Sequence, residues 1–97
     1  MIKIDTDMHY PYKKLFDVMI DTGKLCFETV GRDEEGRLIL HRSRTVNMSS
    51  AYGEEDEYYV LSQEEFEACA RKACKNRHIG KKDLAKYIPG AKDRQGK

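Results

Sequence analysis

The residues best placed to do chemistry are the lysines and arginines that crowd the C-terminal part of the chain. Residues 71–97 carry 10 lysines and arginines against 2 aspartates and glutamates, a balance of +8. Residues 1–70 carry 8 against 15, a balance of −7. Such a basic cluster can neutralise phosphates or carboxylates on a partner. The net charge of +1 therefore conceals a directed electrostatic surface.

Cysteine and histidine supply a second set of candidates. Cys74 and His78 are four residues apart and would share a face of one continuous helix, but Cys69 would lie off that face and Cys26 would have to join from elsewhere. No closely spaced CxxC or HxxxH pair exists. Free cysteine on an apolar stripe behaves as a small hydrophobe. The sequence therefore predicts that the cysteines pack in the core and hold no metal.

Catalytic patterns are weaker still. A thiol and an imidazole, Cys26 and His41, could face each other across a hairpin, but nothing supplies a lowered thiol pKa or an orienting third group. The acidic run 54–57 lacks the fixed geometry that a general acid and base require. The chain contains no GxGxxG, P-loop, GxSxG or HExxH motif. We therefore expect a protein that is not an enzyme and needs no cofactor.

The element that positions the basic residues is a helix predicted over residues 61–77. Ser62 and Glu65 have capping-box spacing, in which each side chain bonds the other residue's free backbone N–H. Apolar residues then recur with helical period, from Phe66 to Cys74. Acids occupy the first turns and bases the last, as the helix dipole favours. The basic residues would thus begin on the last turns of a stable helix.

The residue patterns in the rest of the chain predict a small sheet and two more helices. Helical spacing from Tyr12 to Ile20, with Gly23 as C-cap, predicts a helix near the N-terminus. Further elements follow from apolar period and turn residues: a strand at residues 2–4, a hairpin of strands at 24–30 and 37–48, an exposed mobile acidic loop at 49–57, a strand at 58–61 and a helix at 81–88. The predicted fold class is α+β, with an antiparallel sheet of about three strands, or four with the N-terminal one, packed on one face by helices in the order (β)-α-β-β-β-α-α.

Length and composition set the frame for these elements. The 97 residues make one domain, which we place at residues 1–90, with residues 91–97 as a flexible basic tail. No apolar run approaches the roughly 20 residues of a membrane span. The N-terminus lacks the apolar core and cleavage site of a secretory signal. An odd count of three cysteines favours reduced thiols, so we expect a cytoplasmic protein without membrane contact.

These observations lead to a functional hypothesis. We expect a small binding protein, a regulator or inhibitor of the kind that phages encode, that docks on a protein or nucleoprotein complex with an acidic surface. The alternative is direct, sequence-independent binding of DNA or RNA by the same residues, and a homodimer stays open as well. The binding residues would be the cations of the C-terminal helices and one tyrosine of the acidic loop, a residue type favoured at interfaces: Arg71, Lys72, Lys75, Arg77, Lys81, Lys82, Lys86 and Tyr52.

Overall fold

The computed structural model describes residues 1–6, 8–48 and 51–88. Over these residues the chain forms five strands followed by two helices. In chain order they are β1 (Ile2–Lys3), β2 (Lys13–Asp21), β3 (Cys26–Arg32), β4 (Leu38–Met48), β5 (Ala51–Val60), α1 (Gln63–Lys75) and α2 (Lys81–Tyr87). The predicted basic tail at 91–97 lies outside the described residues.

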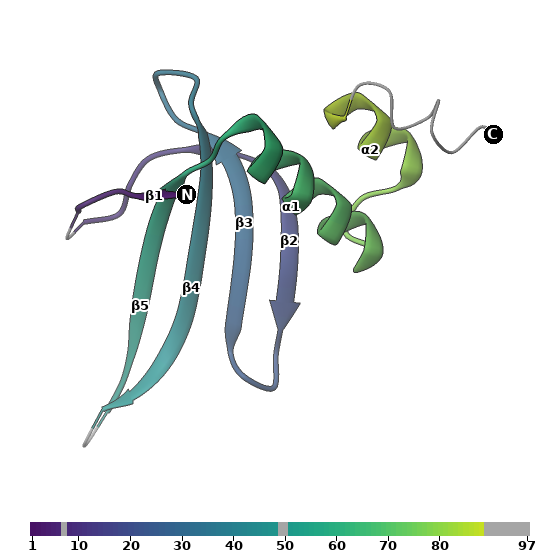
Figure 1. Cartoon of the computed structure of the whole chain (residues 1–97). Helices are drawn as coiled ribbons and strands as arrows, with labels where there is room; N and C mark the ends of the chain where they lie inside the picture. The colour runs from purple at the N-terminus through teal and green to yellow at the C-terminus, as the bar shows by residue number, and fades with distance from the viewer. Residues whose placement is uncertain (7, 49–50, 89–97) are drawn as a thin grey trace.

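The strands form one antiparallel sheet in the order β1-β5-β4-β3-β2 (Figure 1). The long strand β2 forms one edge, and the short strand β1 lies beside β5 at the other. The α+β class and the antiparallel sheet are confirmed, as are the hairpin of β3 and β4 and the short N-terminal strand. The expected count of about three strands, or four with the N-terminal one, is too low, because the segment predicted as the first helix is a strand; a second segment, predicted as a loop, lengthens the strand expected at 58–61.

The first of these segments is β2, which the sequence predicted to be a helix. Its pairing with β3 is interrupted by bulges at Leu15 and Val18, between Lys14 and Phe16 and between Asp17 and Met19. Each bulge inserts an extra residue and shifts the alternation of inward and outward side chains. Apolar residues consequently fall in adjacent pairs along the strand, which imitates helical spacing. Gly23 lies in the turn between β2 and β3 and caps no helix.

The second segment is β5, most of which was predicted to be a mobile loop. Its acidic residues lie on a strand, and two of them face cations of β4 in the ladder: Arg42 is opposite Glu57, and Arg44 is opposite Glu55. Cross-strand pairs of opposite charge stabilise a sheet by roughly 0.2–1 kcal/mol each. This pairing with β4 outweighs the low strand propensity of glutamate and aspartate. Residues 49 and 50 of the predicted loop lie outside the described residues.

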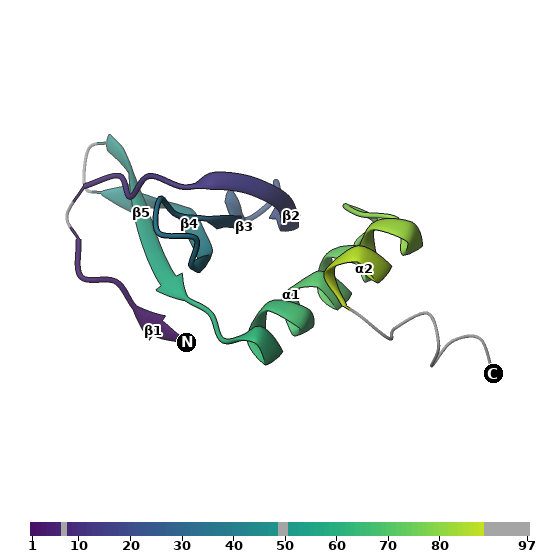
Figure 2. The ribbon, with the colours of Figure 1, turned by 90° about the horizontal axis from the view of Figure 1, so that it is seen from above.

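The helices pack on one side of the sheet, beside β2 (Figure 2). Helix α1 lies along β2, and α2 packs against α1 and, through Tyr87, against Phe16 of β2. The predicted apolar stripe of α1 is confirmed, since Phe66, Ala70 and Ala73 are all buried. The helices therefore cover the β2 side of one sheet face, a narrower cover than predicted. The core between these layers consists of Phe16, Val18, Val30, Leu40, Leu61, Phe66, Ala70, Ala73, Leu84 and Ile88.

The other face of the sheet carries the connection from β1 to β2, residues 4–6 and 8–12, which we call the strap. It crosses from one edge of the sheet to the other on the side away from the helices (Figure 2). Gly31 makes this close approach possible: a Cβ there would overlap the carbonyl oxygen of Lys13 and lie 2.5 Å from Cδ2 of Tyr12. The close packing of the chain over position 31 therefore requires glycine there.

Candidate functional site

Both ends of helix α1 are fixed by local hydrogen bonds. At its start Ser62 accepts from the backbone N–H of Glu65, and Glu65 accepts from that of Ser62, so the predicted capping box is confirmed. Glu65 also accepts from the N-terminal amine of Met1. This amine and the backbone N–H of Ser62 lower the pKa of Glu65 to about 2. The helix is therefore anchored to β1 at the end opposite its basic residues.

At its other end α1 closes in a Schellman motif. The N–H of His78 donates to the carbonyl of Ala73 at 2.9 Å, and that of Arg77 donates to Cys74 at 3.0 Å. Arg77 has a φ of +64°, a left-handed conformation that glycine favours and that strains other residues. A long cation thus occupies the position where glycine most often ends a helix. The motif points the chain into the turn that leads to α2.

The seven helical cations predicted to bind lie on α1, α2 and the turn between them, and all are exposed. Two of them make weak contacts within their own helix: Arg71 lies 4.0 Å from Glu67, and Lys86 lies 3.6 Å from Asp83. Four have no ion-pair partner among the described residues: Lys75, Arg77, Lys81 and Lys82. These six residues, Arg71, Lys75, Arg77, Lys81, Lys82 and Lys86, are named the basic face below.

Lys72 differs from the other six. Its Nζ donates to Oε1 of Glu28 on β3 at 3.1 Å, while Nε of Arg42 donates to Oε2 of the same carboxylate at 2.9 Å. The side chain of Glu28 is only 9% exposed. Burial alone would raise the pKa of Glu28, but the bonds from Lys72 and Arg42 outweigh it and leave the pKa below its ordinary value. Lys72 therefore holds α1 to the sheet.

Tyr52 lies apart from these cations. It sits on β5, paired with Asn47 of β4 in the ribbon that extends from the sheet, whereas the basic face lies beyond β2 at the opposite edge (Figure 1). The structure thus brings the helical cations together and does not bring Tyr52 to them. A single contact surface containing all eight predicted residues would have to span the sheet.

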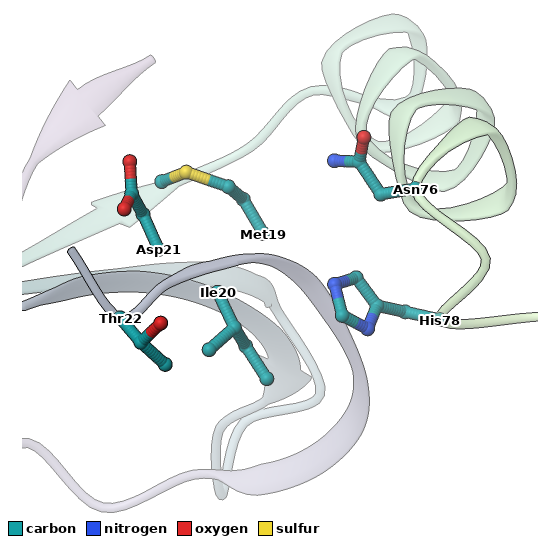
Figure 3. Close-up of a pocket in the computed structure, with 6 residues that line it drawn as sticks. All are labelled: Met19, Ile20, Asp21, Thr22, Asn76 and His78. Carbon is teal, nitrogen blue, oxygen red and sulfur yellow. The ribbon is translucent and has the colours of Figure 1, made fainter. Parts of the chain in front are cut away.

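A hollow lies between the end of β2 and the C-terminal end of α1 (Figure 3). Met19, Ile20, Asp21 and Thr22, at the end of β2, line one side. Asn76, the C-cap of α1, and His78, in the turn beyond it, line the other. Nδ2 of Asn76 donates to the carbonyl of Val18 at 2.9 Å, and this bond closes the edge of β2 at that point.

The sequence did not reveal a polar network beneath the strap. The hydroxyl of Tyr12 bonds Nδ1 of His41 at 2.7 Å, and Nε2 of His41 bonds Asp56 at 2.7 Å. The rings of His41 and Tyr58 stack with centroids 4.5 Å apart, and Nδ1 of His9 bonds the hydroxyl of Tyr58 at 3.1 Å. These residues come from the strap, β4 and β5, so only the fold unites them. The sequence offered one signal for this network: His41 lies two residues after Ile39 on the predicted strand and therefore shares its face.

This network holds the strap against the sheet through the bonds from Tyr12 to His41 and from His9 to Tyr58. Burial raises the pKa of the Tyr12 hydroxyl and so disfavours the phenolate that a nucleophile would need. Burial alone would raise the pKa of Asp56, but hydrogen bonds from His41 and Ser43 keep it low. The carboxylate therefore stays ionised as an acceptor for His41. Each buried polar group in the network has a partner, which favours an anchoring role.

The catalytic and metal pairs considered from the sequence are not assembled. Cys26 is opposite Arg44 and His41 is opposite Thr29 in the β3–β4 ladder, which places Cys26 and His41 on opposite faces. His78 lies beyond the end of α1, so it does not share a helical face with Cys74. Among the described residues, no three potential ligands gather closely enough to hold a metal ion.

The other cysteines pack as expected. Cys69 and Cys74 lie half-buried against the core. Burial raises the pKa of the Cys69 thiol, which reduces its reactivity at neutral pH. Neither described helix has the length and apolar character needed to traverse a bilayer.

Comparisons with known proteins add no further candidate. The chain matches no known family, no curated protein and no solved structure. Its function must therefore be argued from its own surface.

Proposed function

We propose that this protein is a small, non-enzymatic binding protein that docks through the basic face on an acidic or phosphate-lined surface of a protein or nucleoprotein complex. The observation that carries the proposal is the set of exposed cations on the basic face, four of which lack an ion-pair partner among the described residues. Unpaired surface charges steer association and select an oppositely charged partner. The protein acts in the cytoplasm as a regulator or inhibitor of that complex.

Arg77 gives this proposal particular support. Holding a non-glycine residue in the left-handed region costs about 1 kcal/mol, and glycine at this position would remove that cost. Strained residues cluster at functional sites because the surrounding structure tolerates their cost for another purpose. The guanidinium of Arg77 is exposed and contributes a cation to the basic face. A binding role accounts for the arginine where stability alone favours glycine.

The proposal is tested with two charge reversals of equal size. Lys81→Glu with Lys82→Glu changes the basic face, and acids in the first turn of α2 suit the helix dipole, so folding is preserved. Lys13→Glu with Lys24→Glu changes two exposed cations, one on β2 and one in the turn between β2 and β3, and serves as the control. Fluorescence anisotropy of labelled poly-glutamate should show binding that the first pair abolishes and the second retains. Equal weakening by both pairs would contradict a localised site.

The alternative, direct nucleic-acid binding, is decided by the same titration with labelled single-stranded DNA, duplex DNA and duplex RNA. If about five phosphates were neutralised, affinity would fall roughly 500-fold between about 50 and 200 mM salt. Submicromolar binding with that salt dependence, lost in Lys81→Glu with Lys82→Glu, would replace the proposed partner by nucleic acid. If none of the three nucleic acids binds at low salt, direct nucleic-acid binding is excluded and a protein surface remains as the proposed partner.

A further inference from the structure

The outer edge of β5, the side that faces away from β4, is left open along most of its length. Strand β1 pairs only with Tyr59 and Val60, and Ile4 donates its N–H to the carbonyl of Tyr58 at 2.7 Å. Within residues 51–57 no described strand pairs on that side. Figure 1 shows β1 beside one end of β5, and next to it the strap residues Thr6, Met8 and His9 line a hollow with Glu54 and Asp56.

The main-chain groups that this edge presents follow from the ladder. In an antiparallel strand the N–H and C=O of one residue point to the same side, and the side alternates along the chain. The carbonyl of Tyr58 points outward to Ile4, and the register between β4 and β5 is unbroken. Glu54 and Asp56 therefore also point their N–H and C=O outward. None of these four groups has a hydrogen-bond partner in the described part of the chain.

The ribbon that carries this edge extends past the rest of the sheet. Pairing of β3 with β4 ends at Arg44, and the N–H of Thr45 makes one last bond to the carbonyl of Leu25, at 2.9 Å. Beyond that point, residues 46–48 pair only with residues 51–53. A two-stranded ribbon is marginally stable in water without a further strand or a packed layer. Glu54 and Asp56 lie next to this ribbon, opposite Thr45 and Ser43, so a strand that added there and continued past Glu54 would give the ribbon a third strand.

The side chains along this edge are acidic on both faces of the sheet. Residues 54–57 are Glu-Glu-Asp-Glu, and Glu54 is exposed without an ion pair among the described residues. A lysine already uses this edge: Lys3 of β1 places its Nζ 3.2 Å from the carboxylate of Glu57. A strand that continued β1 along β5 would bring its own side chains next to Glu54 and Asp56 in the same way.

We propose that the outer edge of β5, at Glu54 and Asp56, binds an extended basic segment of a partner protein as an added strand. The main-chain groups supply hydrogen bonds, and lysine or arginine at alternate positions of the segment pairs with the carboxylates. A second copy of this edge does not fit, because its acids would face those of the first. This surface lies at the edge of the sheet opposite the basic face, so the inference stands independently of the proposed function.

The test uses a labelled short peptide in which lysine alternates with valine, titrated by fluorescence anisotropy into the full-length protein. The same peptide with N-methyl groups on alternate residues keeps its charge but cannot complete the ladder. We expect the parent peptide to bind and the methylated one to lose binding. Equal affinities would overturn the proposal, because binding would then rest on charge alone. No binding of the parent peptide at about 1 mM would overturn it as well.

Two substitutions of Glu54 separate the contribution of its charge to peptide binding from that of its main-chain N–H. Glu54→Gln keeps the outward N–H and removes the charge, and should weaken the peptide up to about five-fold. Glu54→Pro also removes that N–H while sparing the ladder to β4, which an edge position tolerates. It should bind about three- to ten-fold more weakly than Glu54→Gln, the effect of one hydrogen bond. Equal affinities of the two variants, with thermal unfolding confirming the fold, would contradict the added strand.

Discussion

Glu28 is the residue through which the sheet holds both Arg42 and Lys72, and Glu28→Gln removes its charge with little change of shape. Hydrogen bonds to charged groups contribute roughly 1.5–3 kcal/mol each when shielded from water. The side chains of Lys72 and Arg42 are 52% and 39% exposed, so solvent reduces each contribution. We expect Glu28→Gln to lower the free energy of unfolding at pH 7 by about 1–2 kcal/mol, measured by urea denaturation.

The pH dependence of this loss identifies its origin. The pKa of Glu28 is lowered in the folded state, so its charge stabilises the fold above the ordinary value of 4.5. That contribution disappears as the pH falls below 4.5 and through the folded pKa. The difference between wild type and Glu28→Gln should therefore shrink as the pH is lowered from 7 toward 3. An equal loss at both ends of this range would refute the electrostatic reasoning and indicate a packing defect.

The matched control is Glu35→Gln. The side chain of Glu35 is 73% exposed and lies 3.7 Å from Nε of Arg37, a surface contact expected to contribute less than about 0.5 kcal/mol. A companion variant, Lys72→Met, should destabilise the protein by up to about 1 kcal/mol and leave binding of poly-glutamate by the basic face unchanged. Loss of that binding in Lys72→Met would show that Lys72 also contributes to the docking surface.

Three further substitutions test the packing and the site. Gly31→Ala should destabilise the fold by about 1–3 kcal/mol, because the new methyl group overlaps Lys13 and Tyr12; thermal unfolding by circular dichroism measures this, and an unchanged midpoint would contradict it. Arg77→Gly should raise stability by about 0.5–1 kcal/mol and weaken poly-glutamate binding, whereas an unaltered affinity would argue against a role for this cation. Tyr12→Phe should cost about 1–2 kcal/mol, since Nδ1 of the buried His41 loses its partner; no loss in urea denaturation would mean that water replaces the hydroxyl.

The sequence predicted the elements whose signals are local. The capping box of Ser62 and Glu65 and the apolar stripe that begins at Phe66 define α1 without reference to the rest of the chain. The segments that were predicted wrongly depend on partners. Bulges at Leu15 and Val18 make sense only against β3, and they gave β2 a helical spacing.

The same distinction holds for the site. Charge and sequence position were enough to gather the cations of the basic face, because consecutive helical elements carry them. They could not show that Lys72 bonds Glu28, 44 residues earlier in the chain. Nor could they show that the acids of β5 form a strand edge, since that depends on the register with β4. Long-range pairing, which single-sequence patterns do not encode, decides both.

The most direct test of the central claim is quantitative affinity capture from nuclease-treated cytosol of the source cell. Three baits are compared at about 50 and 200 mM salt: wild type, Lys81→Glu with Lys82→Glu, and the control Lys13→Glu with Lys24→Glu. We expect a protein partner that wild type and control retain at low salt, that higher salt releases, and that the basic-face reversal fails to capture. An identical set of proteins on all three baits would contradict docking through the basic face.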